Sequence, residues 1–307
     1  AVVIMRRFVI LALCVAVALA KPAIDIHRIA RINSDAESTW TAGINRKFIG
    51  WSTDDVKQLL GSFRSDDVEA MFPPGPDFVG DVPDAYDVRN DGCGDYILDQ
   101  GQCGSCWAFG TATSLTDRFC LKDEDWDVNV VLSPQTLVSC DWEGNMGCNG
   151  GMPHLAWDYC EFKGLPTLTC MPYVSGDGTN GHCNSTDCAT DEDMVRYKAK
   201  KFTTHNYAGE DKIKAAIYNG GSVTATIDVY EDFMDYADGV YEHTEGSYLG
   251  GHAIRFLGYG ETDEGVKYWI LANSWGYDWG IDGTFLMVRG KGNCGVESGA
   301  CAGDADF

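Results

Sequence analysis

Thirteen cysteines constrain the fold of this 307-residue chain more than any other feature. Twelve of them lie from Cys93 to Cys301, and the remaining one, Cys14, lies in an apolar N-terminal run. Disulfides form and persist in oxidising compartments, so such a chain is expected to leave the cytosol. If one cysteine is a free nucleophile, the other eleven cannot all pair within the chain.

The first twenty residues predict the route of export. Arg6 and Arg7 precede an apolar run from Phe8 to Ala20, which ends in small residues. This is the pattern of a secretory signal peptide. The alternative, a transmembrane anchor, requires about 20 apolar residues, and this run is shorter. We expect residues 1–20 to be removed, with no membrane attachment afterwards. The chain would then enter the secretory pathway and reach lysosome- or vacuole-like vesicles or the extracellular space.

The rest of the chain divides near residue 80. Residues 21–80 contain no cysteine and end in a stretch with prolines at Pro73, Pro74 and Pro76, which prevents a helix and favours proteolysis. We predict a removable pro-segment over residues 21–80 and a mature domain over residues 81–307. The alternative is a small N-terminal domain on a proline-rich linker.

The mature part predicts an α+β fold. Ala108, Ala112, Leu115 and Phe119 recur at helical spacing, in a helix that begins at or just before Cys106. The second half holds short β-rich runs separated by turn residues, at residues 222–227, 253–257, 268–271 and 284–288. A helical half followed by a β half predicts two lobes with a cleft between them.

Charge and composition exclude some function classes. The formal net charge of -23 excludes nucleic acid as a partner, because a phosphate backbone would repel the protein. A hydrophobic fraction of 45% is typical of a globular protein and excludes general disorder.

The string around Cys106, from Gln100 to Phe109, predicts a thiol nucleophile. A thiol with its usual pKa of about 8.5 holds little thiolate at neutral or acidic pH. A helix N-terminus beside the sulfur and a nearby imidazolium both stabilise the thiolate. Gln100 and the backbone N–H of Cys106 are expected to donate to a developing oxyanion.

The candidate base lies far along the chain. His252 follows two glycines at the start of a β run, and Asn273 lies about twenty residues further on. An asparagine side-chain oxygen accepts a hydrogen bond from the imidazole and fixes its orientation. Trp275 is expected to shield that bond from water.

Cys103 and Cys106 also form a C-x-x-C pair, which is compatible with redox exchange or a zinc site. Redox exchange requires a thioredoxin-like βαβ context, which the sequence lacks. Zinc requires a second pair, for which only Cys183 and Cys188 are available. We therefore expect no metal and no cofactor, and a disulfide at Cys103.

These motifs resemble the papain family of cysteine peptidases, and the resemblance extends over residues 82–298. It implies a papain-like fold with a helical left lobe, an antiparallel β-barrel right lobe and an N-terminal propeptide. It implies Cys106 as nucleophile, His252 as base, Asn273 as the orienting residue and Gln100 in the oxyanion hole. Peptides and proteins would be the substrates, and the propeptide would lie in the cleft in the reverse direction as an inhibitor.

Residues 39–45 and several later segments resemble the cathepsin B branch in particular. By similarity, four disulfides are expected: Cys93–Cys120, Cys103–Cys148, Cys140–Cys183 and Cys170–Cys188. Cathepsin B also has an occluding loop with a histidine pair that binds a substrate's C-terminal carboxylate. The corresponding residues 170–188 hold only His182. We therefore expect an endopeptidase with little carboxydipeptidase activity.

The S2 pocket, which receives the second residue before the scissile bond, departs from cathepsin B as well. Gly299 aligns with the glutamate that lets cathepsin B accept arginine there, so burial of an arginine would be uncompensated. We expect a preference for apolar side chains in S2. The resemblance implies these substrate-binding residues: Gly104, Gly150, Gly151, Met152, Pro153, Thr226, Ala253, Trp275 and Gly299.

The sequence thus predicts a monomeric cysteine endopeptidase, made as an inactive precursor, that acts through a thioacyl-enzyme on Cys106. One alternative is a catalytically silent binding protein of the same fold, against which the four polar site residues argue. Another is a peptide ligase, in which an amine outcompetes water for the acyl-enzyme.

Overall fold

The computed structural model describes residues 20–64, 69–78, 80–123, 125–127, 129–184 and 186–307. Residues 1–19 of the predicted signal peptide lie outside this part. Within the described part, no helix is long and apolar enough to cross a membrane. The helices are α1 (Ile26–Ser34), α2 (Thr53–Lys57), α4 (Cys106–Lys122), α5 (Pro134–Cys140), α6 (Pro153–Phe162) and α7 (Glu210–Gly220).

The strands gather mostly in the second half of the chain and form two sheets. The larger has nine strands in the order β1-β6-β9-β8-β7-β5-β10-β4, with β2 paired to β7, and the smaller pairs β11 with β3. The strands are β1 (Trp40–Ala42), β2 (Tyr86–Asp87), β3 (Lys198–Ala199), β4 (His205–Tyr207), β5 (Val223–Tyr230), β6 (Tyr236–Tyr241), β7 (Tyr248–Glu261), β8 (Lys267–Ala272), β9 (Thr284–Val288), β10 (Ala300–Ala302) and β11 (Ala305–Asp306).

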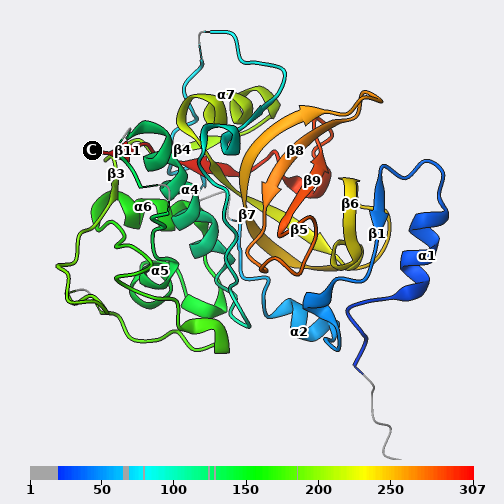
Figure 1. Ribbon diagram of the computed structural model, residues 1–307, viewed down its shortest axis with the longest axis horizontal. Coiled ribbons are helices and arrows are strands. Elements are labelled where there is room, and N and C mark those ends of the chain that lie inside the picture. The colour runs from blue at the N-terminus through cyan, green and yellow to red at the C-terminus, as the bar shows by residue number, and fades with distance from the viewer. Residues whose placement is uncertain (1–19, 65–68, 79, 124, 128, 185) are drawn as a thin grey trace, which may run out of the picture.

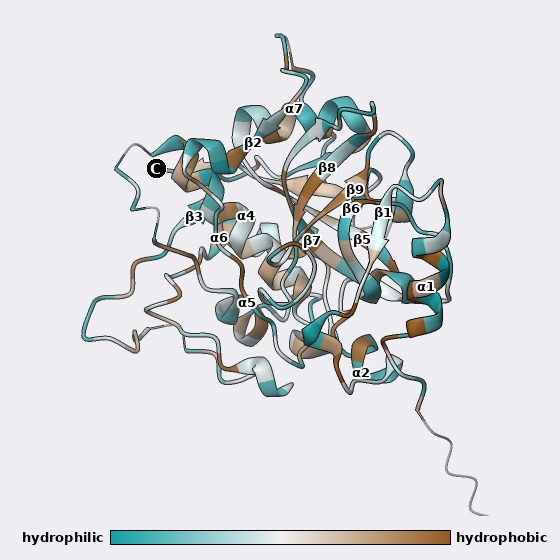
Figure 2. Ribbon diagram, turned by 45° about the vertical axis from the view of Figure 1, so that its right-hand side comes forward, coloured by the Kyte–Doolittle hydropathy of each residue, from teal (hydrophilic) through white to brown (hydrophobic). Residues whose placement is uncertain are grey.

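Helix α4 joins the helical part to the sheet. It packs against α5 and α6 on one side and against β5 and β7 on the other, and Figure 1 shows it between the helices and the sheet. Its residues from Cys106 to Phe119 are all buried, so hydrophobic burial holds the helix in place from all sides. Brown, hydrophobic stretches run along the central strands in Figure 2, which marks the core of the sheet.

The N-terminal segment packs onto this body. Its strand β1 pairs antiparallel with β6 at the edge of the large sheet. Buried side chains of the segment, including Trp40, Phe48 and Leu59, belong to the same hydrophobic cluster as the mature core. Figure 1 shows α1, β1 and α2, in blue, along the sheet side of the molecule. This shared core is not the arrangement of an independent domain on a linker.

The predicted α+β class is confirmed, with helices and a large, mostly antiparallel sheet in separate parts of the molecule. The expected helix begins at Cys106, and the four expected β runs lie in β5, β7, β8 and β9. Strand β7 is 14 residues long, much longer than its predicted run, because the backbone at Gly250 and Gly251 stays paired to β5. One pairing, between β6 and β9, is parallel.

Candidate active site

The predicted nucleophile lies at the first residue of α4. Ser105 is the N-cap residue, and its side chain makes no capping bond to the helix. Its hydroxyl instead lies 2.9 Å from the Tyr173 hydroxyl, which donates to the Gln100 carbonyl at 2.8 Å. Tyr173 therefore fastens the loop before the helix to the predicted oxyanion residue.

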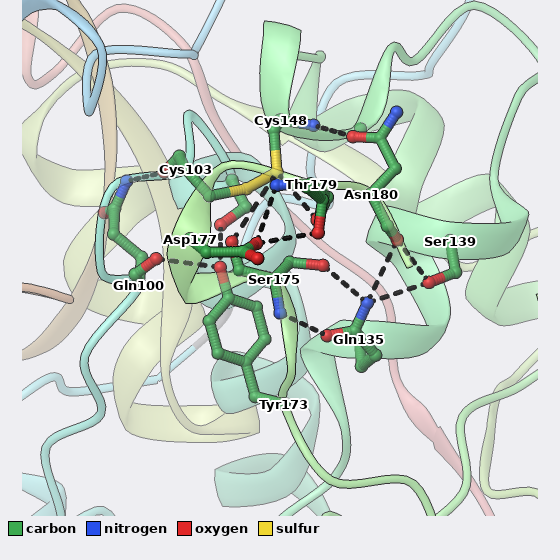
Figure 3. The surroundings of a disulfide bond; sticks show 12 residues. Gln100, Cys103, Gln135, Ser139, Cys148, Tyr173, Ser175, Asp177, Thr179 and Asn180 are labelled. Carbon is green, nitrogen blue, oxygen red and sulfur yellow. Dashed lines mark hydrogen bonds between the residues drawn. A yellow bond between two sulfur atoms is a disulfide. The ribbon is translucent and has the colours of Figure 1, made fainter. Parts of the chain in front are cut away.

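The Cys103–Cys148 disulfide holds this loop against the segment that carries Gly150 and Gly151. Figure 3 shows a polar network behind the disulfide: Asn180 Oδ1 accepts from the Cys148 N–H at 2.7 Å, and Gln135 donates to Ser175 Oγ at 2.7 Å. Nothing in the sequence marked this network, because its members come from segments far apart along the chain.

The structure has four disulfides, and they join the pairs that the resemblance implied: Cys93–Cys120, Cys103–Cys148, Cys140–Cys183 and Cys170–Cys188. Cys103, Cys183 and Cys188 are therefore not free thiols in this structure. In the described part of the chain, the free thiols are Cys106, Cys160, Cys294 and Cys301.

His252 and Asn273 meet at neighbouring strand positions. His252 lies on β7, Asn273 directly follows β8, and the imidazole Nε2 lies 2.7 Å from Asn273 Oδ1. The Trp275 ring is fully buried and its centroid lies 4.7 Å from that of the imidazole. The indole thus covers the imidazole as the sequence analysis expected, and it keeps water from the bond.

A peptide segment of the N-terminal region occupies the space before these residues. The Leu59 carbonyl accepts from Gln100 Nε2 at 2.9 Å, and Gln100 Nε2 also donates to the Cys103 carbonyl at 2.6 Å. Gly61 lies so close to the Gly104 carbonyl that a Cβ there would overlap it. Only glycine fits at this crossing, which brings the Gly61 backbone next to the nucleophile.

The same segment pairs with Gly151; Gly150 and Gly151, two of the predicted substrate-binding residues, are called the ledge below. The Gly151 N–H donates to the Gly61 carbonyl at 2.8 Å, and the Phe63 N–H donates to the Gly151 carbonyl at 2.9 Å. The resulting bridge between Ser62 and Gly151 is parallel. This direction agrees with the reverse orientation implied for the propeptide.

The ledge itself rests on two side chains that sequence reasoning missed. Asn145 Oδ1 accepts from the Met152 N–H at 2.7 Å, and Asn145 Nδ2 donates to Asp141 Oδ2 at 2.6 Å. Both residues are buried, at 2% exposure each. Burial raises the pKa of Asp141 to about 7, with the bond from Asn145 acting in the opposite direction.

The other residues predicted for S2 lie near residues 62–69 of the N-terminal segment or near each other. Thr226 Oγ1 lies 3.0 Å from Ser62 Oγ, and Ala253 pairs with Thr226 across β5 and β7. Pro153 begins α6 next to Met152. Gly299 lies against the side chains of Arg64 and Glu69. The structure therefore brings the predicted S2 residues to the place where the N-terminal segment crosses the cleft.

Burial keeps the candidate catalytic pair uncharged in this form. It raises the pKa of the Cys106 thiol to about 11, although backbone groups of Ala253 and Gly61 lower it in part. Burial also lowers the pKa of His252 to about 4, against the hydrogen bonds with Asn273 and the Leu59 carbonyl. Both pKa shifts oppose formation of the expected thiolate–imidazolium pair while residues 59–61 cover these groups.

Ion pairs fasten the N-terminal segment to the rest of the protein. Arg28 Nε lies 2.6 Å from Asp235 Oδ2 with both side chains buried, and Lys21 lies 2.6 Å from Glu231. Two further ion pairs, Arg31–Glu245 and Lys47–Asp99, are more exposed than the Arg28–Asp235 pair. In each pair the cation comes from the N-terminal segment and the anion from the strongly acidic mature part.

Comparisons with known proteins agree with this geometry. Residues 82–303 match the family described as papain family cysteine protease. The chain is 40% identical to cathepsin B-like CP3 of Giardia intestinalis over 297 residues, covering 95% of this chain and 97% of that protein. It is 32% identical to cathepsin B-like protease 1 of Arabidopsis thaliana, covering 90% and 82%.

A solved precursor has the same overall structure. ProCathepsin B S9 from Trypanosoma congolense superimposes with a TM-score of 0.84 at 29% sequence identity, covering 93% of this chain and all of that chain. The similarity therefore includes the N-terminal segment in the cleft as well as the mature domain.

Proposed function

This chain belongs to the papain family of cysteine proteases, and we propose that it is a cysteine endopeptidase precursor whose nucleophile is Cys106. Residues 1–20 form its signal peptide, residues 21–80 its inhibitory propeptide and residues 81–307 its peptidase domain. The observation that carries the proposal is the backbone of residues 59–61 in the cleft. It brings a carbonyl to Gln100 Nε2 at 2.9 Å and places Gly61 beside Cys106.

The mechanism follows from these positions. Once the propeptide leaves, water reaches Cys106 and His252, and the thiol proton moves to the imidazole. The thiolate attacks a substrate carbonyl carbon, forming the S–C bond, while Gln100 and the Cys106 N–H hold the oxyanion. His252 then gives its proton to the leaving amine as the C–N bond breaks. Water, deprotonated by His252, hydrolyses the thioester and restores the enzyme.

Asn273 acts on this chemistry through His252. Its Oδ1 accepts from the imidazole Nε2, which leaves Nδ1 as the nitrogen that exchanges a proton with the thiol. In the precursor the Leu59 carbonyl faces this imidazole, so Nδ1 becomes available for that exchange once residues 59–61 leave the site. Trp275 keeps the His252–Asn273 bond dry, and the bond therefore stays strong throughout the cycle.

We further propose that the enzyme acts within chains and prefers apolar side chains in S2. Residues 170–188 contain a single histidine, His182, which is exposed. One exposed imidazole lacks the paired cationic groups needed to bind a C-terminal carboxylate. Thr226, Ala253 and Gly299 provide no charge to S2, so a lone arginine there would lack compensation.

The four disulfides support a route through the secretory pathway, to lysosome- or vacuole-like vesicles or the extracellular space. The mature enzyme is expected to act as a monomer on peptide and protein substrates, without a cofactor.

Cleavage assays test the proposal. The acid-processed protein should cleave internally quenched peptides with Leu or Val in S2 and should release little dipeptide from substrates with a free C-terminus. Cys106→Ala should abolish cleavage, with a loss of at least about 10⁴-fold. Cys160→Ala, at another buried free thiol, is the matched control and should stay active. Efficient dipeptide release, or full activity without the Cys106 thiol, would contradict it.

A further inference from the structure

Two glycines at the proposed S2 subsite, Gly295 and Gly299, lie against charged side chains of the propeptide. A Cβ atom at Gly299 would lie 3.2 and 3.3 Å from two guanidinium nitrogens of Arg64, and 3.1 Å from Glu69 Oε1. A Cβ at Gly295 would lie 2.9 Å from Arg64 Nη1. The guanidinium thus takes the place that a side chain at either glycine would occupy.

The two propeptide side chains pair with each other. Arg64 Nε lies 3.6 Å from Glu69 Oε1, and the side chains keep only 30% and 13% of their exposure. A guanidinium that is largely withdrawn from water without a counter-charge is costly. Glu69 therefore supplies the carboxylate that position 299 lacks.

Backbone contacts on both sides bring these residues together. Before Arg64, the Ser62 N–H donates to the Gly251 carbonyl at 3.0 Å. After Glu69, the Asn206 N–H donates to the Pro73 carbonyl at 2.8 Å. The segment is anchored to the mature domain at both ends, so Arg64 and Glu69 return to the same pocket although they are five positions apart.

We propose that this widened S2 subsite binds a guanidinium–carboxylate ion pair carried by one peptide segment, and that Arg64 and Glu69 are its occupant in the precursor. The inference rests on the proposed function, because it names what fills S2 of that protease. The chemical class of ligand is a peptide that presents an arginine together with an acidic residue, so that the pair enters the pocket with no net charge.

One carboxylate of the mature domain offers a competing explanation. Asp228 Oδ2 would lie 3.9 Å from a Cβ at Gly295. If Asp228 balanced the guanidinium, the subsite would bind a lone cation and Glu69 would be dispensable. Glu69 is the residue that forms an ion pair with Arg64 here, while Asp228 lies beyond ion-pair distance of it.

The test measures how fast an epoxysuccinyl thiol-protease inhibitor alkylates Cys106 in the intact precursor at pH 7, read by mass. Glu69→Gln leaves the guanidinium unpaired and should speed alkylation about tenfold. Glu69→Asp keeps a carboxylate beside the guanidinium and should be alkylated at a rate close to that of the wild type. Arg64→Gln combined with Glu69→Gln should be slower than Glu69→Gln alone. Asp54→Asn, at an exposed pair with Lys57, is the control and should change nothing.

Each outcome decides the matter. An unchanged rate in Glu69→Gln, or an acceleration in Glu69→Asp as large as in Glu69→Gln, overturns the proposal. If alkylation is faster than in the wild type for Asp228→Asn but not for Glu69→Gln, Asp228 is the residue that balances the guanidinium. That result also overturns the proposal. The wild type freed of its propeptide by acid serves as the reference for the proposed function. If Cys106 resists the inhibitor even there, the proposed function fails, whatever the propeptide variants do.

Discussion

The Leu59 carbonyl oxygen lies 2.9 Å from Gln100 Nε2 and accepts its hydrogen bond. In the proposed mechanism, this Gln100 N–H donates to the oxyanion of the substrate. In the precursor it donates to a propeptide carbonyl instead. The contact explains how the precursor is inhibited with every catalytic group in place. It also means that anything that loosens the propeptide frees Gln100, Cys106 and His252 together.

The buried Arg28–Asp235 pair should matter more to this inhibition than the exposed Arg31–Glu245 pair. The side chains of the first pair are 3% and 0% exposed, and those of the second are 59% and 32% exposed. Arg28→Gln leaves a buried carboxyl without its partner and should weaken propeptide binding by about 3–5 kcal/mol. Arg31→Gln should weaken it far less, because water screens this exposed pair. The rate of Cys106 alkylation in the precursor at pH 7 compares them, and equal rates would refute the ranking.

Acid should open the precursor partly through His154. Burial lowers the pKa of this imidazole to about 4, and the positive charge of Arg64 lowers it further, while Asn206 acts in the opposite direction. The Phe72 ring of the propeptide packs against it, with ring centroids 5.3 Å apart. Once exposed, the imidazole would titrate near its usual pKa of about 6.5.

The sign of the pH effect follows from this difference. The open form binds the proton more tightly, so the closed form has its full stability above about pH 6.5 and loses it as the pH falls toward 4. His154→Gln should flatten the pH dependence of alkylation in this window by up to about tenfold per pH unit. His27→Gln, at an exposed position on α1, should leave the profile unchanged. Identical profiles for wild type and His154→Gln would rule out His154 as a sensor.

Gly299→Glu should change substrate preference in the mature enzyme. Position 299 has no left-handed backbone angle, and the three atoms nearest its Cβ position belong to flexible propeptide side chains, so we expect a glutamate to fit once the propeptide has left. It should raise the ratio of kcat/KM for Arg over Leu in S2 by about tenfold or more. Ser298→Glu adds the same charge at an exposed neighbouring position and should leave the ratio nearly unchanged. A ratio that does not rise would show that position 299 does not face S2.

Asn145→Ala should impair substrate binding more than chemistry. The Asn145 side chain holds the Met152 N–H and is itself held by Asp141, so its loss leaves buried polar groups unpaired next to Gly151. That loss is typically about 1–3 kcal/mol. KM should rise with little change in kcat. Asn129→Ala, in an exposed loop, should alter neither, and a fall in kcat alone for Asn145→Ala would contradict the assignment.

Local patterns allowed much of the fold and of the candidate site to be predicted. The helix at Cys106 and the strand at His252 have periodicities and flanking glycines that a single segment reveals. The charge state of the site was not predictable in this way. Burial raises the pKa of Cys106 and lowers that of His252, and that burial depends on contacts between distant segments.

Other features depend on contacts across more than a hundred residues. Arg28 and Asp235 are 207 positions apart, and neither has a motif that singles it out. Gly299 indicated that S2 lacks the glutamate of cathepsin B. A glycine, however, gives no information about which side chains of the propeptide lie next to it. Tyr173 and Asn180 contact Gln100 and Cys148 over shorter separations of 73 and 32 positions, from a segment that local sequence marks only as a loop.

Active-site titration of the acid-processed protein tests the central claim most directly. An epoxysuccinyl inhibitor is added in increasing amounts, while intact mass and residual cleavage of a peptide with Leu in S2 are recorded. We predict one inhibitor per chain, attached to Cys106, with activity lost in proportion to labelling. A processed protein that takes up no inhibitor at Cys106, or that still cleaves the peptide when fully labelled there, would contradict the account.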